Sequence, residues 1–323
     1  MTRAADEVSP YDVLGVSTGA AAQEGVVVQG TGGVWQVRTA AGDTVAASMR
    51  GRLKQEGRDV LKLAVGDAVQ LEREPAGDAW AIAAILPRRS RLARRAPGGA
   101  YGERVVVANV DQVLVVFAAA QPEPNARMLD RFLVIAEANG LAARVVVNKA
   151  DLVTGAQAEA LFPDQRAAGY PVHHTSVADG RGLDALRAEL TGRCTALTGP
   201  SGVGKSSLMN ALFPGLTLRT AAISASVNKG RHTTVGAMLH PLPAGGYVAD
   251  TPGLREVGLW GIPQQGVADC FPEFRPFLDG CRFGDCTHLV EPGCALREAV
   301  AGGAVRAARY DSFTTLRAEL TDA

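Results

Sequence analysis

Residues 199–206 read Gly199-Pro200-Ser201-Gly202-Val203-Gly204-Lys205-Ser206, and this stretch is the strongest structural signal in the central part of the chain. It fits G-x-x-x-x-G-K-[ST], in which glycines let successive backbone N–H groups turn toward phosphate oxygens. An apolar segment precedes it and a helical pattern follows it, so the positive end of the helix dipole also faces the phosphates. The sequence predicts a nucleotide site lined by Gly199 through Ser207, with Lys205 on the β- and γ-phosphates as a catalytic group and Ser206 on Mg²⁺.

A second motif, Asn148-Lys149-Ala150-Asp151, directly follows the apolar segment 143–147. Nucleotide sites lie at the carboxyl ends of parallel strands. The carboxylate of Asp151 can accept hydrogen bonds from the ring N–H and the exocyclic amine of guanine, and adenine lacks that amine. Beside a phosphate-binding loop on the same sheet, the motif predicts a guanine site. Ser176, at the end of the segment 172–175, is a further candidate for a hydrogen bond to the guanine edge.

A third motif, Asp250-Thr251-Pro252-Gly253, follows the apolar segment 246–249. It is typical of a loop that brings a carboxylate near Mg²⁺ and a glycine N–H near the γ-phosphate, and a plain strand-ending turn is the alternative. The polar stretch 224–234 is typical of a switch loop, in which Thr233 or Thr234 would complete the magnesium shell. The predicted magnesium ligands are therefore Ser206, Asp250 and one or both of these threonines.

Residue 254 bears on the rate of hydrolysis. Many GTPases carry a glutamine after D-x-x-G that orients the attacking water, whereas this chain has Leu254. We therefore expect slow intrinsic hydrolysis unless a partner or another residue positions the water. Thr234 and His232 are the candidate catalytic groups in the switch stretch, and the alternative for His232 is that it only shapes the loop.

The order of these motifs is unusual. In the usual GTPase core the phosphate-binding loop comes first and the guanine motif last, whereas here 148–151 precedes 199–206 and 250–253. The same sheet can be closed from different cut points, because domain termini lie at the surface and often near each other. Alternating strand and helix patterns over 103–260 therefore predict an α/β domain with a doubly wound parallel sheet and circularly permuted connections.

The regions before this domain have different patterns. Residues 1–22 are rich in Ala, Gly and Ser, and we expect a flexible tail. Residues 23–87 contain five short β-branched segments with turn residues between them, which predicts a small β-barrel, with the OB-fold as the natural candidate and a ligand-free β-domain as the alternative. Residues 88–102 look like a basic linker whose arginines either contact phosphates or are simply solvated. These arginines are Arg88, Arg89, Arg91, Arg94 and Arg95.

The C-terminal region, 261–323, contains a cluster of soft ligands spaced Cys281-x4-Cys286-x-His288-x5-Cys294. Three thiolates and one imidazole fit a tetrahedral structural zinc site with no open position for catalysis. The alternative is four unrelated buried residues. The region closes with a helical pattern, 305–320, so we expect a mostly helical zinc-binding domain.

Composition limits the remaining classes of function. The chain has 323 residues with 33 Lys and Arg against 33 Asp and Glu, so its net charge is zero and any polyanion binding must come from local patches. No apolar run reaches the ~18–20 residues that a membrane span needs, and the first residues lack the apolar stretch of a signal peptide. We therefore expect a cytoplasmic protein without a membrane partner, and a monomer.

Together, the barrel, the permuted motifs and the Cys/His cluster resemble the ribosome small-subunit-dependent GTPase A family over nearly everything from about residue 22 onward. The resemblance rests on 148–151, 199–207, 230–234, 250–253 and the four cluster residues. It implies hydrolysis of GTP to GDP and phosphate that is stimulated by the small ribosomal subunit. It also implies a role in late maturation of that subunit through contacts with ribosomal RNA.

Two alternatives stay open. One is a GTP-dependent binding switch with a protein partner and little turnover, and the other is a P-loop ATPase or kinase, which Asp151 disfavours because it selects guanine. A further hypothesis follows from the short spacing between Gly253 and the Cys/His region. Nucleotide state could reposition the C-terminal module.

Overall fold

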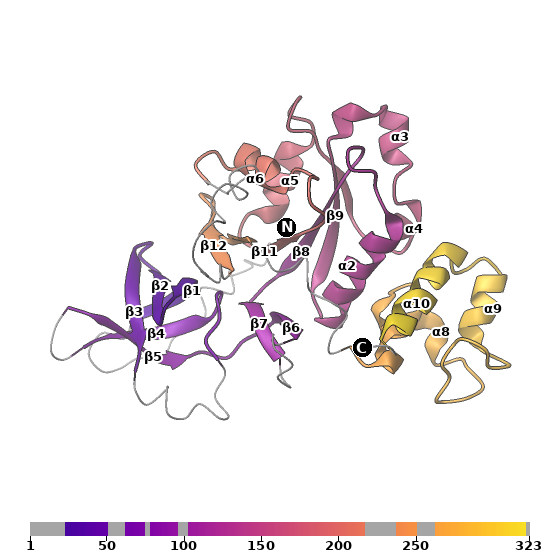
Figure 1. The fold of residues 1–323 in the computed structure, drawn as a ribbon, viewed down its shortest axis with the longest axis horizontal. Helices are drawn as coiled ribbons and strands as arrows, with labels where there is room; N and C mark the ends of the chain where they lie inside the picture. The colour runs from indigo at the N-terminus through magenta and orange to yellow at the C-terminus, as the bar shows by residue number, and fades with distance from the viewer. Residues whose placement is uncertain are drawn as a thin grey trace, which may run out of the picture.

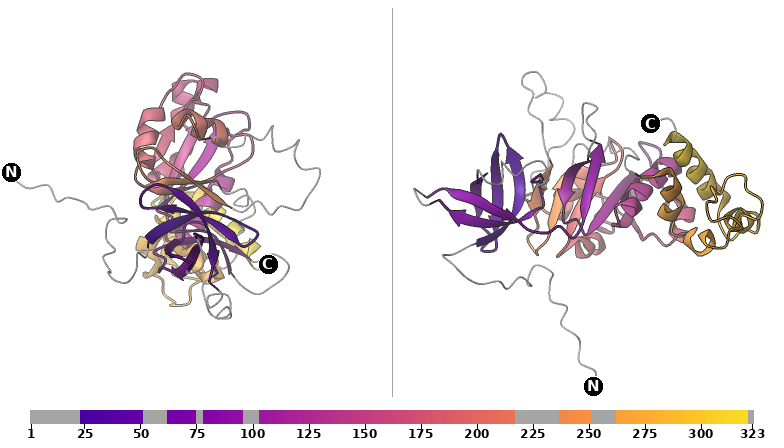
Figure 2. Two further views of the ribbon diagram at one scale, coloured as in Figure 1. Left: turned by 90° about the vertical axis from the view of Figure 1, so that its left-hand side faces the viewer. Right: turned by 90° about the horizontal axis from the view of Figure 1, so that it is seen from below.

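The computed structural model describes residues 23–50, 62–74, 78–95, 103–216, 237–250 and 262–320. Figure 1 shows three bodies, a β-barrel at the N-terminal end, a central α/β body and a helical C-terminal body, and Figure 2 shows that they follow one another along the long axis. Within the part of the chain that the structure describes, no helix is long and apolar enough to cross a membrane.

Five strands at the N-terminal end close into a barrel in the order β1-β2-β3-β5-β4. Their bounds are Gln23–Thr31 for β1, Val34–Thr39 for β2, Thr44–Met49 for β3, Ala68–Arg73 for β4 and Trp80–Ile85 for β5. β3 pairs with β5 in parallel, and the other pairs are antiparallel. Alternating apolar side chains such as Val37, Leu71 and Ile82 fill the interior. The barrel predicted from the sequence is confirmed.

Part of the basic segment 88–102 forms a regular strand. Strand β6 (Arg91–Arg95) pairs antiparallel with β7 (Glu103–Ala108) in a separate two-stranded sheet, which also removes β7 from the main sheet where the alternating pattern had predicted it. Arg88 is buried against Asp67, with Nε and Nη2 donating to the two carboxylate oxygens at 2.6 and 2.8 Å. Arg88 is therefore unavailable as a phosphate contact, because its guanidinium already forms an ion pair with Asp67 inside the protein.

The central sheet has the order β10-β9-β8-β11-β13-β12. The strands are β8 (Gln112–Ala118), β9 (Ala142–Asn148), β10 (Val172–His174), β11 (Cys194–Thr198), β12 (Met238–Pro241) and β13 (Tyr247–Asp250). All neighbours are parallel except β12, which runs antiparallel to β13. The parallel, doubly wound sheet predicted from the sequence therefore carries one antiparallel edge strand, because the short turn 242–246 between β12 and β13 can only join antiparallel strands.

Helices cover both faces of the sheet, as the doubly wound prediction requires. Helix α2 (Ala126–Ala138) packs Leu129 and Leu133 on one face, while α5 (Leu183–Leu190) and α6 (Lys205–Leu212) pack on the other. Every residue of β8 is buried, because its side chains alternate between these two cores. Shorter elements near β9 are η1 (Ala150–Leu152), α3 (Gly155–Glu159) and α4 (Pro163–Ala167).

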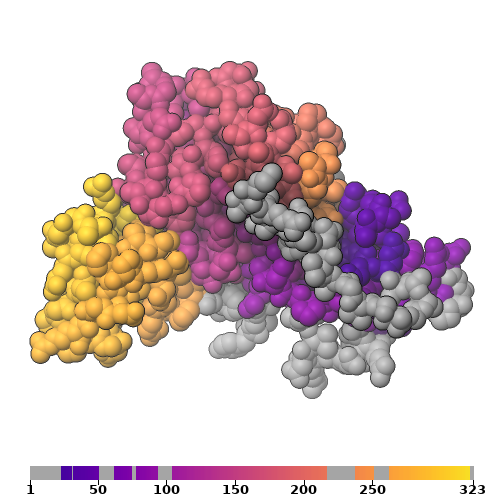
Figure 3. Space-filling model, turned by 180° about the vertical axis from the view of Figure 1, so that it is seen from behind, coloured from indigo at the N-terminus to yellow at the C-terminus, as the bar shows by residue number. Residues whose placement is uncertain are grey.

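The C-terminal body is mostly helical, as predicted. It contains η3 (Gln264–Cys270), α8 (Arg275–Leu278), α9 (Ala295–Ala301) and α10 (Ala307–Glu319). Three buried aromatic rings form its core: Phe271 stacks on Phe274 with centroids 4.7 Å apart, and Phe313 meets both rings edge-on. Helix α10 lies beside α2 in Figure 1, and Figure 3 shows this body packed on the central domain away from the barrel.

Candidate nucleotide site and Cys/His cluster

The loop 199–204 joins β11 to α6, as predicted, and its glycines are there for steric reasons. Gly199 has φ +129°, and an added Cβ would lie 2.1 Å from the carbonyl oxygen of Val116. Gly204 is the residue before α6, with φ +89°, and an added Cβ would lie 2.7 Å from Nδ2 of Asn148. Other residues cannot adopt these conformations without displacing the neighbouring strands, so the loop geometry depends on glycine at both positions.

Lys205 begins helix α6 and folds back over the loop. Its Nζ donates to the carbonyls of Gly199 and Pro200 at 2.7 and 2.6 Å. The ammonium group therefore lies at the amino end of a helix, beside a turn with exposed Ser201 and Gly202. A positive charge and a helix amino terminus together favour a bound polyphosphate.

The predicted magnesium ligands Ser206 and Asp250 lie on neighbouring elements. Ser206 is in the first turn of α6, and Asp250 is the last residue of β13, paired in register with Leu197 of β11. His240 of β12 is a residue that the sequence analysis did not single out. Burial lowers its pKa, and the nearby carboxylate of Asp250 raises it in part. The imidazole therefore favours its neutral form beside this carboxylate.

Asn148 ends β9 and is almost completely buried. Its Nδ2 donates to the carbonyl of Val203 at 2.9 Å, and its Oδ1 accepts from the Thr175 hydroxyl at 3.1 Å. The side chain thus ties the β9 end to the phosphate loop. Lys149 follows in a left-handed conformation with φ +57°, and its Nζ donates to the carbonyl of Gln121.

Asp151 and Ser176 lie side by side at the ends of neighbouring strands. The Ser176 hydroxyl donates to Oδ1 of Asp151 at 2.6 Å and accepts from the N–H groups of Ala178 and Asp179 at 3.2 and 3.3 Å. Ser176 is fully buried, whereas Asp151 is exposed. The hydroxyl therefore orients a carboxylate that faces solvent at the carboxyl edge of the sheet.

Several predicted site residues lie outside the described residues. They are His232, Thr233, Thr234, Gly253 and Leu254. Of the residues that the sequence analysis missed, Thr175 could have been found because it directly precedes Ser176. Gln121 and Pro122 carry no pattern that points to the site, because they reach it only through the fold.

The Cys/His cluster is brought together as the spacing predicted. The ligand atoms of Cys281, Cys286, His288 and Cys294 all lie within 4.8 Å of one another. Sγ of Cys281 is 3.9 Å from Sγ of Cys294 and 3.4 Å from Nδ1 of His288. A tetrahedral zinc with bonds of about 2.3 Å to sulfur separates two sulfurs by ~3.8 Å, so the donor set fits such an ion.

Surrounding groups hold this cluster in shape. The Tyr310 hydroxyl of α10 donates to the carbonyl of His288 at 2.6 Å. Glu291 accepts from the N–H groups of Thr287 and Leu289 at 2.9 and 3.1 Å. Hydrogen bonds led by that from the Thr287 side chain hold the pKa of Glu291 well below its usual range. The ligand loop is therefore fixed by neighbours of its own, independently of the nucleotide site.

Comparison with known proteins supports this arrangement. The sequence model of the RsgA GTPase family matches residues 85–260. The chain is 70% identical over 297 residues to the small ribosomal subunit biogenesis GTPase RsgA of Gemmatimonas aurantiaca, covering 92% of this chain and 97% of the relative. It is 40% identical over 298 residues to the protein of the same name from Moorella thermoacetica, covering 92% and 97%.

Solved structures agree with these relatives. The crystal structure of YjeQ from Thermotoga maritima superimposes with a TM-score of 0.78 at 32% identity, covering 93% of this chain and 99% of that one. YloQ, described as a circularly permuted GTPase, superimposes with a TM-score of 0.72 at 27% identity, covering 94% and 96%. The permuted order of motifs read from the sequence therefore corresponds to a known arrangement of this fold.

Proposed function

The chain belongs to the RsgA GTPase family, and from this premise we propose that it acts in late maturation of the small ribosomal subunit, with GTP hydrolysis stimulated by that subunit. It is a P-loop GTP hydrolase with circularly permuted connections. The role in subunit biogenesis is the one that the names of its relatives state.

One observation carries the assignment of the nucleotide site. The guanine motif and the phosphate loop, distant in sequence, are joined by the bond between Asn148 and Val203. On one side of that bond Lys205 donates to the carbonyl of Gly199 in the phosphate loop, and on the other side Ser176 orients Asp151. We assign the phosphates to Gly199 through Ser207 and the base to Asp151, with Lys149 and Ala150 beside it.

The chemistry expected at this site is transfer of the γ-phosphoryl group to water, for which catalysis is mainly positioning and charge stabilisation. Lys205 would neutralise charge on the transferred group. The proposed ligands of Mg²⁺ are Ser206, Asp250 and Thr233 or Thr234, and the ion, when bound, would neutralise charge that develops on the phosphates. Leu254 cannot orient water, so we assign that task to the subunit or to His232, with the Gly253 N–H on the γ-phosphate.

We further propose that the Cys/His cluster holds one structural zinc ion. The fit of sulfur and nitrogen spacings to a tetrahedral ion supports it, and with four protein ligands no position remains for catalysis. A zinc ion can supply on the order of 10 kcal/mol to a small domain. The C-terminal helices would owe part of their stability to it.

The proposed partner is the small ribosomal subunit, contacted through its RNA by the barrel and by the basic segment 88–95, in which Arg89 and Arg91 are exposed. A five-stranded barrel of this order is a common nucleic-acid-binding scaffold. We propose that the protein acts as a monomer in the cytoplasm, where ribosomal subunits mature. The alternative, a GTP-dependent switch for a protein partner with little turnover, is favoured by Leu254 alone.

Phosphate release from GTP, measured with the full chain alone and with purified small subunits, tests the proposal. We expect slow phosphate release by the protein alone and strong stimulation with subunits. Lys205→Ala should release no phosphate above background under either condition. Tight GTP binding without stimulation would contradict the ribosomal role and support the switch. Stimulation by large subunits to the same extent would contradict the specificity for the small one.

A further inference from the structure

Helix α2 is attached to the C-terminal domain through two carboxylates on one of its faces. Asp130 and Glu137 lie two helical turns apart. Arg309 of α10 forms an ion pair with Asp130, and Nη2 of Arg275 donates to Glu137 at 2.7 Å. The first pair is buried, with side chains 1% and 2% exposed, whereas Arg275 is half exposed. Of these two ion pairs, that of Arg309 is the one withdrawn from solvent.

The environment of Arg309 is a closed network of partners from both domains. Its Nε donates to Glu273 at 2.6 Å, and its guanidinium carbon lies 4.6 Å from the centre of the Phe271 ring. On the other side, Gln165 donates to the same Asp130 oxygen at 2.6 Å. Removing Arg309 from the packed interface would leave Asp130 buried without its ion-pair partner, which is strongly destabilising. This network therefore helps to hold the C-terminal domain on α2.

The amino end of α2 reaches the nucleotide site. Asn125 caps the helix by accepting from the N–H of Met128 at 3.0 Å, and the preceding loop carries Gln121 and Pro122. The carbonyl of Gln121 accepts the bond from Lys149 of the guanine motif. Pro122 faces the phosphate loop, since a Cβ on Gly202 would lie 3.7 Å from its Cδ. Moving α2 would therefore disturb both nucleotide motifs.

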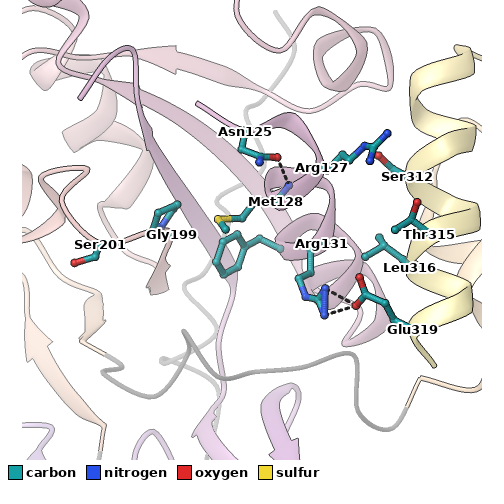
Figure 4. A pocket seen from close by; sticks show the side chains of 12 residues that line it. Asn125, Arg127, Met128, Arg131, Gly199, Ser201, Ser312, Thr315, Leu316 and Glu319 are labelled. Carbon is teal, nitrogen blue, oxygen red and sulfur yellow. Dashed lines mark hydrogen bonds and ion pairs between the residues drawn. The ribbon is translucent and has the colours of Figure 1, made fainter. Parts of the chain in front are cut away.

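A cavity of about 560 Å³ lies between the phosphate loop, α2 and α10 (Figure 4). Arg131 and Glu319 form an ion pair across it, joining α2 to α10 a second time. Because one cavity is bounded by the phosphate loop and by the C-terminal helix, the position of α10 shapes the surroundings of Gly199 and Ser201.

We propose that Arg309 is a positioning residue for the nucleotide site. By holding α2 on the C-terminal domain, it holds the loop 121–125 against Lys149 and the phosphate loop, and so slows nucleotide release. A partner that pulls the C-terminal domain away from α2 accelerates nucleotide release. Without such a partner, α2 and the C-terminal domain stay packed together. The inference rests on the proposed function only in requiring that this site binds guanine nucleotide.

The test uses the full-length protein with its metal and without subunits. In Arg309→Met, which keeps the volume but removes the charge, GDP release followed with a fluorescent GDP analogue should be about fivefold faster or more. Amide hydrogen exchange should rise in residues 121–134 and 199–204. Arg309→Lys should lie between the variant and the wild type. Arg306→Met is the matched control, because this arginine is three residues away and 67% exposed.

Faster exchange confined to residues 262–320, with wild-type GDP release, would overturn the proposal. If Arg309→Met does not fold, Asp130→Asn and Arg309→Lys carry the same test, and wild-type release in both would also overturn it. The assay separates this inference from the proposed function. A wild-type protein that fails to bind GDP contradicts the nucleotide assignment, whereas absent stimulation by subunits leaves the release measurements unchanged.

Discussion

The Asn148 side-chain amide donates a 2.9 Å hydrogen bond to the main-chain carbonyl of Val203, so the guanine motif directly holds the phosphate loop. With its other atom, Oδ1, accepting from Thr175, both polar atoms of the amide are occupied by protein. The sequence predicts Asn148 as a nucleotide contact. The geometry adds a second role, in fixing the loop that makes the phosphate contacts.

Asn148→Ala should therefore weaken binding through the loop. A buried carbonyl that loses its partner costs about 1–3 kcal/mol, so the Kd for GDP should rise by roughly tenfold and the melting temperature should fall. Fluorescence titration with labelled GDP measures the first and calorimetry the second. Asn139→Ala is the control, because it removes a similar bond, to the carbonyl of Ile135, far from the site. Unchanged GDP affinity in Asn148→Ala would contradict the assigned role.

Asp151→Asn should change base selectivity. The amide offers a donor where the carboxylate accepts, so GTP affinity should fall by about 100-fold or more, while xanthosine triphosphate, which presents a carbonyl there, should bind better. Competition between the two nucleotides measures the change. Asp184→Asn alters a carboxylate that pairs with Arg187 at the surface and should leave selectivity intact. Equal GTP affinity in Asp151→Asn would mean that another residue reads the base.

Removal of the metal should unfold the C-terminal domain locally. Cys286→Ala leaves three ligands for the metal. Because the Tyr310 hydroxyl of α10 donates to the carbonyl of His288, loosening of the ligand loop should also destabilise α10. Zinc content should drop from about one ion per chain, and limited proteolysis should cut within 262–320. GTP binding should persist, with release no faster than in Arg309→Met. Cys270→Ala, outside the cluster, should retain its zinc. Full protease resistance of metal-free Cys286→Ala would argue against a structural ion.

The parts of the structure that could be predicted from the sequence are those held by interactions between residues close together in the chain. The loop 199–204 and the cluster at 281–294 were predictable, because glycines or ligands at fixed spacing specify their own geometry. The barrel strands were predictable because apolar residues alternate along each of them. The antiparallel strand β12 was missed because its four residues, Met238–Pro241, are too few to show a period.

The Arg309 network had no local pattern at all. Asp130, Glu273 and Arg309 are far apart in sequence, and each alone looks like a surface charge on a helix or turn. Their pairing depends on how two domains pack, which neither composition nor periodicity encodes. The burial of Arg88 could not be predicted for the same reason, because its partner Asp67 lies on the barrel, 21 residues earlier in the sequence.

Arg88 and Arg91 of the basic segment 88–102 can be separated by experiment. Arg88→Met removes the partner of Asp67, which is fully buried, and breaking a buried pair costs about 3–5 kcal/mol. The free energy of unfolding should fall by that order. The salt dependence of binding to small-subunit RNA should stay as in the wild type, because the Arg88 guanidinium is already paired with buried Asp67 and also donates to the carbonyl of Lys62 at 2.7 Å.

Arg91→Ala should behave in the opposite way, because this side chain is exposed on β6. Loss of one phosphate contact lowers the slope of log Kd against log salt by about 1 and weakens binding uniformly across sequences. Stability should change little. Both variants are measured in the same RNA titration at several salt concentrations, with urea unfolding alongside. A lower slope for Arg88→Met would contradict its buried role, and a wild-type slope for Arg91→Ala would exclude this residue from the RNA contact.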